Sequence, residues 1–425
     1  MPPMKAINIE SVLPGDILFT ARPGKVERAI RFFTDGEVSH AMICVQAGSF
    51  IDSTQAGVQA NNIQREFFED DEQVYHFRLR EPAPPQTIAR IVNYARSEIG
   101  ARYSIPEAVR AVVPVGRRPS RRQFCSRLVA RAYAQAGIQL LSDTEYCSPE
   151  DLRNSPLLIE VPISMRRVSA DEIAWRQSGD SPLAAMQKAH NDLLRAAREV
   201  DPNVEALEDI ITLLLRDKTA DEQIDEAQRS SGFLDVWRLE VETHPWRYIP
   251  GQMDESFDET KHPTLRRYCL ATVREGYSGG VRFSQNLAIL RSANRRAPRQ
   301  SFLSQIGLYE TLEANHQVRR EIAYDWLSKN YPADLTREME QIEPHSEHWF
   351  GIVDVVNPDV AATARMVVAA AGNNCVCSVC GDDPSRPYRL ANGAQTLSGV
   401  PSLRLCDDCF NIRSSTPELW IPFLR

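Results

Sequence analysis

Long hydrophobic runs are absent from this sequence of 425 residues. No apolar stretch approaches the roughly 20 residues that a membrane-spanning helix needs. The opening MPPMKAINIESVLPGD has no continuous apolar segment of the kind that a secretory signal contains. We therefore expect no transmembrane segment, no signal peptide and a cytoplasmic location, although a signal-independent export machinery would leave no mark in the sequence.

An excess of basic residues is also lacking. Lysine and arginine number 49 against 57 aspartates and glutamates, which gives a net charge of −8. Such a chain has no overall attraction for nucleic acid or for an anionic membrane surface. The sequence contains no Walker loop, dinucleotide-binding fingerprint or fixed-period repeat, so the protein classes that these motifs mark are not indicated.

Cysteines are few, odd in number and unevenly distributed, with 9 in the whole chain. Without a signal peptide, this argues against a disulfide framework and favours a reducing compartment. Some are scattered through the chain, at Cys44, Cys125, Cys147 and Cys269. The others lie in its last fifth, at Cys375, Cys377, Cys380, Cys406 and Cys409.

Hydrophobic periodicity divides the chain into three parts. Residues 1–165 mix short strands with helices, residues 166–350 are mainly helical, and residues 351–425 contain the cysteine cluster. In the first part, SHAMICVQ at 39–46 predicts a buried strand and SFIDST at 49–54 predicts the next strand. The fold class expected for the first domain is α+β.

Capping residues mark the ends of several helices. Gly100 and Gly137 end helices predicted over 86–99 and 123–136, because glycine readily adopts the left-handed conformation found there. Ser181 begins another helix, with proline at its first position. Further helices are predicted at residues 25–33, 203–216, 264–275, 284–296, 302–330 and after Asn357.

The cysteine cluster has the spacing of a metal site. Two C-x-x-C pairs are separated by 25 residues, and they comprise Cys377, Cys380, Cys406 and Cys409. Two such pairs complete the closed tetrahedral site of a zinc ribbon. We predict one structural zinc ion with no catalytic role, because a four-thiolate site leaves no position open. The spacing leaves open whether Cys375 replaces one of the ligands.

The stretch RRQFCSRLVARAYAQAG at 121–137 places Cys125 in the first turn of a helix. A helix N-terminus lowers a thiol pKa and offers free N–H groups to an oxyanion. His40 lies on an earlier strand, and pairing with the next strand would bring Asp52 beside its imidazole. These are the nucleophile, base and orienting group of a cysteine hydrolase. A buried inert cysteine, a structural histidine and an exposed strand-end carboxylate fit the same positions.

A series of segments in a fixed order resembles a known family. The segments are LPGDILF, SHAMICV, FIDSTQAGVQ, GARYSIPE, FCSRLVARAYAQAGI and CSPEDLRNSPLL. Their order is similar to that of the permuted papain-like hydrolases of the YiiX-like group, which are related to NlpC-like amidases and lecithin:retinol acyltransferase-like enzymes. In this permuted branch the histidine strand precedes the cysteine helix. The resemblance covers about residues 10–160 and implies a circularly permuted papain-like domain, followed here by the helical region and the zinc ribbon.

The resemblance also implies roles for single residues. Cys125 matches the nucleophile and His40 the general base. Asp52 stands where the family has a polar orienting residue, often glutamate. Tyr103 matches a tyrosine that borders the site in NlpC-like enzymes, where it could help to hold an oxyanion or could simply pack. The chemistry implied is acyl transfer through a thioester.

Arginines are concentrated in GRRPSRR, the segment that leads into the cysteine helix. They are Arg117, Arg118, Arg121 and Arg122. Such a group can recognise a carboxylate or phosphate near the thiolate, which makes these residues candidates for substrate binding. An ordinary solvated loop has the same composition.

Two classes of function fit these observations. The first is a cysteine hydrolase, an amidase or peptidase acting on an amide in a peptide or peptidoglycan fragment, with lipid acyl hydrolysis or transfer as the alternative chemistry. In this class the helical and zinc regions would select a substrate or a protein partner. The second is a non-catalytic binding protein that works through its zinc module. Nucleic acid is not the expected partner, since RLCDDCFNIR is mixed in charge.

Overall fold

The chain divides into two compact units, Met1–Leu213 and Leu214–Arg425. The computed structural model describes residues 4–8, 11–21, 36–46, 48–70, 72–104, 121–170, 173–174, 181–274, 279–335, 341–391, 398–416 and 418–424. The helix predicted over 25–33 lies outside these residues, as do Arg117 and Arg118. These two units do not test the predicted division into three parts, which stays a prediction.

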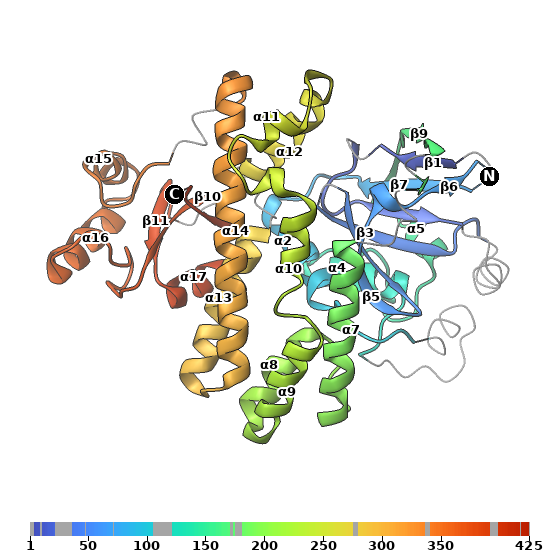
Figure 1. Cartoon of the computed structure of the whole chain (residues 1–425), viewed down its shortest axis with the longest axis horizontal. Coiled ribbons are helices and arrows are strands. Elements are labelled where there is room, and N and C mark those ends of the chain that lie inside the picture. Colours follow the sequence, from blue (N-terminus) through green and yellow to red (C-terminus); the bar gives the residue numbers. More distant parts are fainter. Residues whose placement is uncertain are drawn as a thin grey trace. The chain divides into compact units, whose positions relative to one another are not determined.

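The first unit is built on an antiparallel six-stranded sheet with the strand order β5-β4-β3-β2-β7-β8 (Figure 1). Its strands are β2 (Ile17–Thr20), β3 (His40–Gln46), β4 (Ser49–Thr54), β5 (Gly57–Asn62), β7 (Val74–Leu79) and β8 (Leu158–Val161). A smaller sheet has the order β6-β1-β9 and comprises β1 (Met4–Ile7), β6 (Phe68–Glu69) and β9 (Met165–Arg167). The two strands predicted over 39–46 and 49–54 are confirmed as β3 and β4.

The first unit also contains helices, of which α2 (Pro85–Ser97), α4 (Cys125–Gln135) and α7 (Pro182–Val200) pack against the six-stranded sheet. Its other described helices are α5 (Pro149–Arg153) and α8 (Leu207–Arg216), with a short 3₁₀ turn η2 (Ile63–Arg65). Side chains alternate along β3, so that Ala41, Ile43 and Val45 share a core with α2 and α4. Met42 and Cys44 belong to the core on the other face, with residues of β1 and β6. The sheet is therefore covered on both faces, and β3 is buried along its length.

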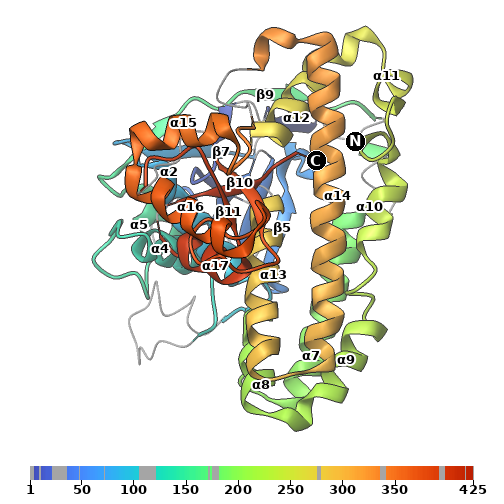
Figure 2. The same ribbon diagram turned by 90° about the vertical axis from the view of Figure 1, so that its left-hand side faces the viewer.

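The second unit is mainly helical, with the long helices α13 (Gly279–Arg296) and α14 (Gln300–Asn330) packed side by side (Figures 1 and 2). Its other helices are α9 (Asp221–Ser230), α10 (Trp237–Thr243), α11 (Gln252–Ser256), α12 (His262–Arg274), α15 (Glu347–Val356), α16 (Pro358–Ala371) and α17 (Asp407–Ser414). The 3₁₀ turns are η3 (Lys218–Ala220), η4 (Pro245–Arg247), η5 (Glu259–Lys261) and η6 (Pro332–Asp334). An antiparallel sheet of order β11-β10-β12 comprises β10 (Arg386–Leu390), β11 (Ser402–Leu405) and β12 (Trp420–Pro422). In the described parts of the chain, no helix is both long and apolar enough to span a membrane.

The predicted helix ends agree with the structure where caps mark them. Gly100 and Gly137 have φ angles of 92° and 86°, which only glycine adopts without strain. Ser181 and Asn357 accept backbone N–H hydrogen bonds at the starts of α7 and α16. The uncapped predictions near 203, 264, 284 and 302 correspond to α8, α12, α13 and α14, which start 2 to 5 residues away.

Candidate active site and metal centre

Cys125 is the first residue of α4, and its side chain is nearly buried, at 5% exposure. The helix begins here because Phe124 is extended, with φ −139° and ψ 163°. The N–H groups in the first turn of a helix have no partner within the helix. At Cys125, the backbone N–H groups of Ala41 and Ser126 hydrogen-bond the sulfur.

The residues after Cys125 fasten the start of α4 to the rest of the domain. Ser126 Oγ donates to the carbonyl oxygen of Cys147 at 2.6 Å. Arg127 is fully buried, and its Nε donates to the carbonyl of Glu145 at 2.7 Å. Its guanidinium also lies 4.4 Å from the centre of the Phe124 ring. The FCSR segment therefore holds Cys125 in place, because the side chains of Ser126 and Arg127 are both hydrogen-bonded to backbone carbonyls.

His40 and Asp52 come together through strand pairing. His40 is the first residue of β3, and Ile43 of this strand pairs with Ile51 of β4. This register places Asp52 on the same face as His40, and the His40 Nε2 and Asp52 Oδ2 atoms are 2.8 Å apart. The Asp52 side chain is only 8% exposed. The structure thus brings His40 and Asp52 together, and His40 also has a hydrogen bond with Cys125, while the catalytic roles of the three residues stay predictions.

Opposing effects set the charges of Cys125 and His40. Burial alone would lower the pKa of His40, but hydrogen bonds to Asp52 and Cys125 and their charges outweigh it and raise the pKa to about 10. Burial alone would raise the pKa of the Cys125 thiol, but the hydrogen bond and charge of His40 and nearby backbone N–H groups lower it. The arrangement therefore favours a thiolate–imidazolium pair.

Glu150 holds the segment that leads into the histidine strand. Its Oε2 accepts hydrogen bonds from the backbone N–H groups of Glu37 at 2.9 Å and Val38 at 3.2 Å. A Cβ on Gly36 would lie 2.6 Å from the same oxygen, so this close approach requires glycine. Ser148 and Asp151 form a capping box that starts α5 and fixes Glu150 within it. The CSPEDL segment therefore positions His40 from a distance in sequence.

Three other predicted site residues, Tyr103, Arg121 and Arg122, lie within the described part of the chain. Tyr103 pairs with Gln123, two residues before Cys125, in an isolated parallel bridge. Arg121 Nη2 lies 2.6 Å from Asp209 Oδ1. Arg122 Nε lies 4.0 Å from Glu205 Oε1. Substrate binding by these arginines and an oxyanion role for Tyr103 stay predictions.

A polar chain behind Asp52 was not predicted from the sequence. Asp52 Oδ1 accepts a hydrogen bond from Asn61 Nδ2 at 2.6 Å. Asn61 Oδ1 in turn accepts one from Gln187 Nε2 of α7 at 3.0 Å. Alternation along VQANN places Asn61 on the same face of β5 as Gln59, which is paired with Asp52, and this is the one sequence signal for Asn61.

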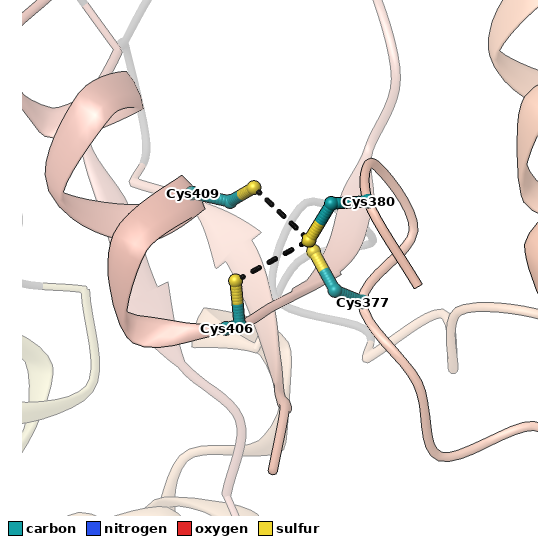
Figure 3. A group of neighbouring side chains, drawn as sticks. All are labelled: Cys377, Cys380, Cys406 and Cys409. Carbon is teal, nitrogen blue, oxygen red and sulfur yellow. Dashed lines mark hydrogen bonds between the residues drawn. The ribbon is translucent and has the colours of Figure 1, made fainter. Parts of the chain in front are cut away.

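The second candidate site is the cysteine cluster of the second unit, formed by Cys377, Cys380, Cys406 and Cys409 (Figure 3). Their sulfur atoms all lie within 4.8 Å of one another. Cys380 Sγ is 3.5 Å from Cys406 Sγ and 3.6 Å from Cys409 Sγ. Four sulfurs at about 2.3 Å from a zinc ion would be separated by about 3.8 Å, so the cluster could hold one metal ion. Cys375 is exposed and is not part of the cluster.

Electrostatics also fit a cation between these sulfurs. Burial and neighbouring thiols raise the pKa of Cys380 to about 12. The hydrogen bond with Cys377, together with burial, raises the pKa of Cys409 still further. Without a positive ion, the four thiols cannot all be ionised at this spacing. A metal ion relieves this repulsion, and the donor set matches the soft thiolate ligands that bind zinc.

Strands and helices of the second unit frame the cluster. Gly381 donates to the carbonyl of Cys377 at 3.0 Å and has a φ of 83°, which closes the first turn. Cys406 is the N-cap of α17, so the second pair spans a strand end and a helix start. Arg291 of α13 joins Asp407 at 2.8 Å. The cysteine cluster is therefore linked to α13 through Asp407, the residue after Cys406.

A cysteine at a helix N-terminus, with a histidine from a strand earlier in the chain, is the arrangement of the permuted papain-like family that the sequence resembles. Residues 11–154 match the model of a family described as "Permuted papain-like amidase enzyme, YaeF/YiiX, C92 family". The resemblance and the fold predicted from the sequence are thereby confirmed for this part of the chain. The match also supports a hydrolase of the amidase or peptidase kind.

Individual proteins are similar to about a third of the chain. The "Probable lipoprotein peptidase YaeF" of Escherichia coli (strain K12) is 27% identical over 182 residues, covering 35% of this chain. The chain spans 65% of that relative's length. The crystal structure of the metalloprotein yiiX from Escherichia coli O157:H7 matches with 15% identity and a TM-score of 0.25, covering 36% of this chain and 97% of that one.

Proposed function

We propose that this protein is a cysteine hydrolase that cleaves an amide bond with Cys125 as nucleophile, His40 as acid and base, and Asp52 as orienting group. The observation that carries the proposal is the connected set of Cys125, His40 and Asp52, with the His40 Nε2 to Asp52 Oδ2 distance of 2.8 Å. The family match over residues 11–154 supports the same chemistry.

The mechanism has an acylation and a deacylation step. The Cys125 thiolate attacks the amide carbonyl carbon, and N–H groups in the first turn of α4 stabilise the oxyanion. His40 gives its proton to the leaving nitrogen as the C–N bond breaks, which leaves a thioester on Cys125. His40 then takes a proton from water, which attacks the thioester and releases the acid and the thiolate. With Nε2 engaged by Asp52, Nδ1 is the ring nitrogen left for these transfers.

The substrate class proposed is a peptide or a peptidoglycan fragment. The Escherichia coli relative is named as a lipoprotein peptidase, which favours a peptide amide as the bond that is cleaved. Tyr103 is placed beside the segment that carries Cys125, where its hydroxyl could assist the oxyanion. Arg121 and Arg122 precede the nucleophile and are proposed to contact an anionic part of the substrate, in competition with their carboxylate partners.

The ion held by the second unit is proposed to be zinc with a structural role. Four thiolates fill a tetrahedral shell and leave no position for a water or a substrate. Cys377, Cys380, Cys406 and Cys409 would each supply one thiolate. Catalysis is therefore assigned to the first unit alone, and the metal is expected to stabilise the fold around α17.

Product analysis tests the proposed function. Wild-type protein and the Cys125→Ala variant are incubated separately with peptides, peptidoglycan fragments and phospholipids, and products are identified by mass spectrometry. We expect new amines and acids from an amide substrate with the wild type only, and a thioester on Cys125 when the reaction is quenched early. Equal products from both proteins would contradict the proposal. Release of fatty acid alone would show that the bond cleaved is a lipid ester and not an amide.

A further inference from the structure

Helix α7 lies outside residues 11–154, yet it is linked to the candidate active site through hydrogen bonds. It packs against β5, the edge strand beside β4. Gln187 Nε2 of α7 donates to the carbonyl of Ala60 at 2.6 Å and to Asn61 Oδ1 at 3.0 Å. Asn61 Nδ2 then donates to Asp52 Oδ1 at 2.6 Å. A continuous line of hydrogen bonds therefore joins α7 to the carboxylate that orients His40.

The two ends of this line define which way the Asn61 amide points. A carboxylate accepts hydrogen bonds and cannot donate one, so Asp52 requires the NH₂ group of Asn61. Gln187 Nε2 is a donor, so it requires the amide oxygen of Asn61. Both requirements are met by a single orientation of the side chain. Without the Gln187 donor, the Asn61 amide is held in this orientation by Asp52 alone. In the rotated amide, the oxygen would face the Asp52 carboxylate, and the hydrogen bond between the two side chains would be lost.

We propose that Asn61 and Gln187 are positioning residues that hold Asp52 against His40, so that α7 completes the active site of the papain-like domain. The consequence for catalysis depends on the proposed function, whereas the consequence for the Cys125 thiol does not. The two oxygens of Asp52 are shared between His40 Nε2 and Asn61 Nδ2. The Asn61 bond therefore limits rotation of the carboxylate away from the imidazole.

The effect passes from Asp52 to the nucleophile through His40. Among the described residues, the titratable groups that act on His40 are Asp52 from β4 and Cys125 from α4. A less firmly held Asp52 would stabilise the imidazolium less, and a less stable imidazolium would favour the Cys125 thiolate less. Loss of Asn61 or Gln187 is therefore expected to make Cys125 less reactive at low pH.

The same helix offers a matched control. Gln59 Nε2 of β5 donates to Asn191 Oδ1 of α7 at 3.0 Å. This bond joins the same two elements as the Gln187–Asn61 bond, and Asn191 lies one helical turn after Gln187. Asn191 makes no described hydrogen bond to Asn61 or Asp52. An Asn191→Leu variant therefore weakens the contact between helix and strand and leaves the line to Asp52 intact.

The experiment compares the full-length wild type with Asn61→Leu, Gln187→Met, the double variant, and Asn191→Leu. Leucine and methionine approximate the shapes of asparagine and glutamine without their hydrogen-bonding groups. Brief alkylation of Cys125 is measured as a function of pH by mass spectrometry, and kcat and KM are measured once an amide substrate is available. Thermal unfolding shows that each variant is folded.

We expect the onset of Cys125 alkylation to move up by about half a unit to one unit in Asn61→Leu and by less in Gln187→Met. The double variant should match Asn61→Leu alone, because Gln187 acts through Asn61. Asn191→Leu should match the wild type. In the kinetic assay, kcat should fall about three- to tenfold with KM nearly unchanged.

Two results would overturn the inference. One is an alkylation profile of Gln187→Met and Asn61→Leu that coincides with that of the wild type. The other is an equal shift in Asn191→Leu, which would assign the effect to helix packing. If no amide is cleaved but the alkylation profiles shift as expected, the proposed function fails and the positioning roles stand. If amides are cleaved and the profiles coincide, the reverse holds.

Discussion

At Cys125, burial and hydrogen bonding act in opposite directions on the thiol, and the partners of the sulfur decide the outcome. Burial favours the neutral thiol, while His40 and the backbone N–H groups of Ala41 and Ser126 favour the thiolate. At Cys44, Cys147 and Cys269, the buried cysteines outside the second-unit cluster, burial outweighs such contacts. Burial raises the pKa of Cys269 to about 12 and raises those of Cys44 and Cys147 further. Outside the second-unit cluster, reactivity is therefore expected at Cys125 and not at Cys44, Cys147 or Cys269.

Removing the imidazole should abolish activity. In His40→Ala, amide hydrolysis should fall about as far as in Cys125→Ala, because nucleophile and base act as one unit. Asp52→Ala should retain more activity, since the base itself is still present. Steady-state rates of the three folded variants check this. An Asp52→Ala variant as inactive as Cys125→Ala would assign Asp52 more than an orienting role.

The pH dependence of activity should follow the His40 proton. The pKa of His40 is raised to about 10, so the imidazolium that protonates the leaving group is present below this pH and is lost above it. Its contribution to stability has the same sign, being fully present below the unfolded pKa of about 6.5 and lost as the pH rises through about 10. In Asp52→Asn, the carboxylate charge is gone and the alkaline limb of kcat/KM should move to lower pH. An unmoved or upward-shifted limb would contradict this.

The site residues predicted from the sequence are reactive or ionisable side chains that stand in recognisable helices or strands. Cys125 stands at a helix start, and His40 and Asp52 stand on adjacent strands, so one hairpin and one helix suffice to bring them near each other. Gln187 belongs to an amphipathic helix that begins far along the chain, where its amide looks like any half-buried polar side chain. Its partner is set by tertiary packing, which periodicity does not encode.

At the scale of elements, close packing around Gly100 joins α2 to α7. Gly100 has a φ of 92°, and a Cβ there would collide with Leu194 of α7. Arg198 Nη2 of the same helix donates to the Gly100 carbonyl at 2.8 Å. This contact adds to the bonds that Gln187 and Asn191 of α7 make with β5. All of them join segments that are distant in the sequence.

Substitution of Gly100 tests this packing. Gly100→Ala should lower the free energy of unfolding by about 2 kcal/mol or more, because it combines an unfavourable φ with a steric clash. Gly137→Ala is the matched control, since Gly137 has a φ of 86° and no atom within 4 Å of its Cβ position. The control should lose only the backbone contribution, about 1 kcal/mol. Urea unfolding measures both, and equal losses would show that the α7 contact adds nothing.

Elements with strong local signals were predicted well, and weakly marked ones were missed. The strands β3 and β4 have the alternation of a buried sheet, and capped helices such as α7 and α16 have their start marked by Ser181 and Asn357. The strand β1 and its partners β6 and β9 are only two to four residues long, so they carry no readable period. Such strands form because neighbouring backbone offers partners, which a single sequence does not reveal.

At the scale of the whole molecule, the chain has two candidate sites built on cysteine, one in each unit. Cys125 lies near an imidazole and a carboxylate, whereas the four thiols of the second-unit cluster lie beside one another. The C-x-x-C spacing predicted this cluster from sequence, because two residues between thiols suit one ion. The strands β10, β11 and β12 near the cluster had no clear period in the sequence. The core of this region includes Ala288 of α13 as well as Trp349 and Trp420.

Metal analysis tests the second unit. The purified protein should contain one zinc ion, and Cys380→Ser combined with Cys406→Ser should remove it and lower the unfolding temperature. Cys375→Ser is the control and should keep the metal, because Cys375 lies outside the cluster. Alkylation of Cys125 should be unchanged in the zinc-free protein if the two sites are independent. Absence of zinc, or its retention in the double variant, would contradict the assignment.

The central claim, that Cys125 is an activated nucleophile paired with His40, is tested most directly by a pH series of brief alkylation in which every cysteine is quantified by mass spectrometry. A free thiol has a pKa near about 8.5 and alkylates slowly at about pH 6. We predict that Cys125 labels below neutral pH in the wild type and that its onset moves up in His40→Ala. Cys375 is exposed and reports on access of the reagent, while Cys44 should label only after unfolding. Labelling of Cys125 only above about pH 8, or only after denaturation, would contradict the account.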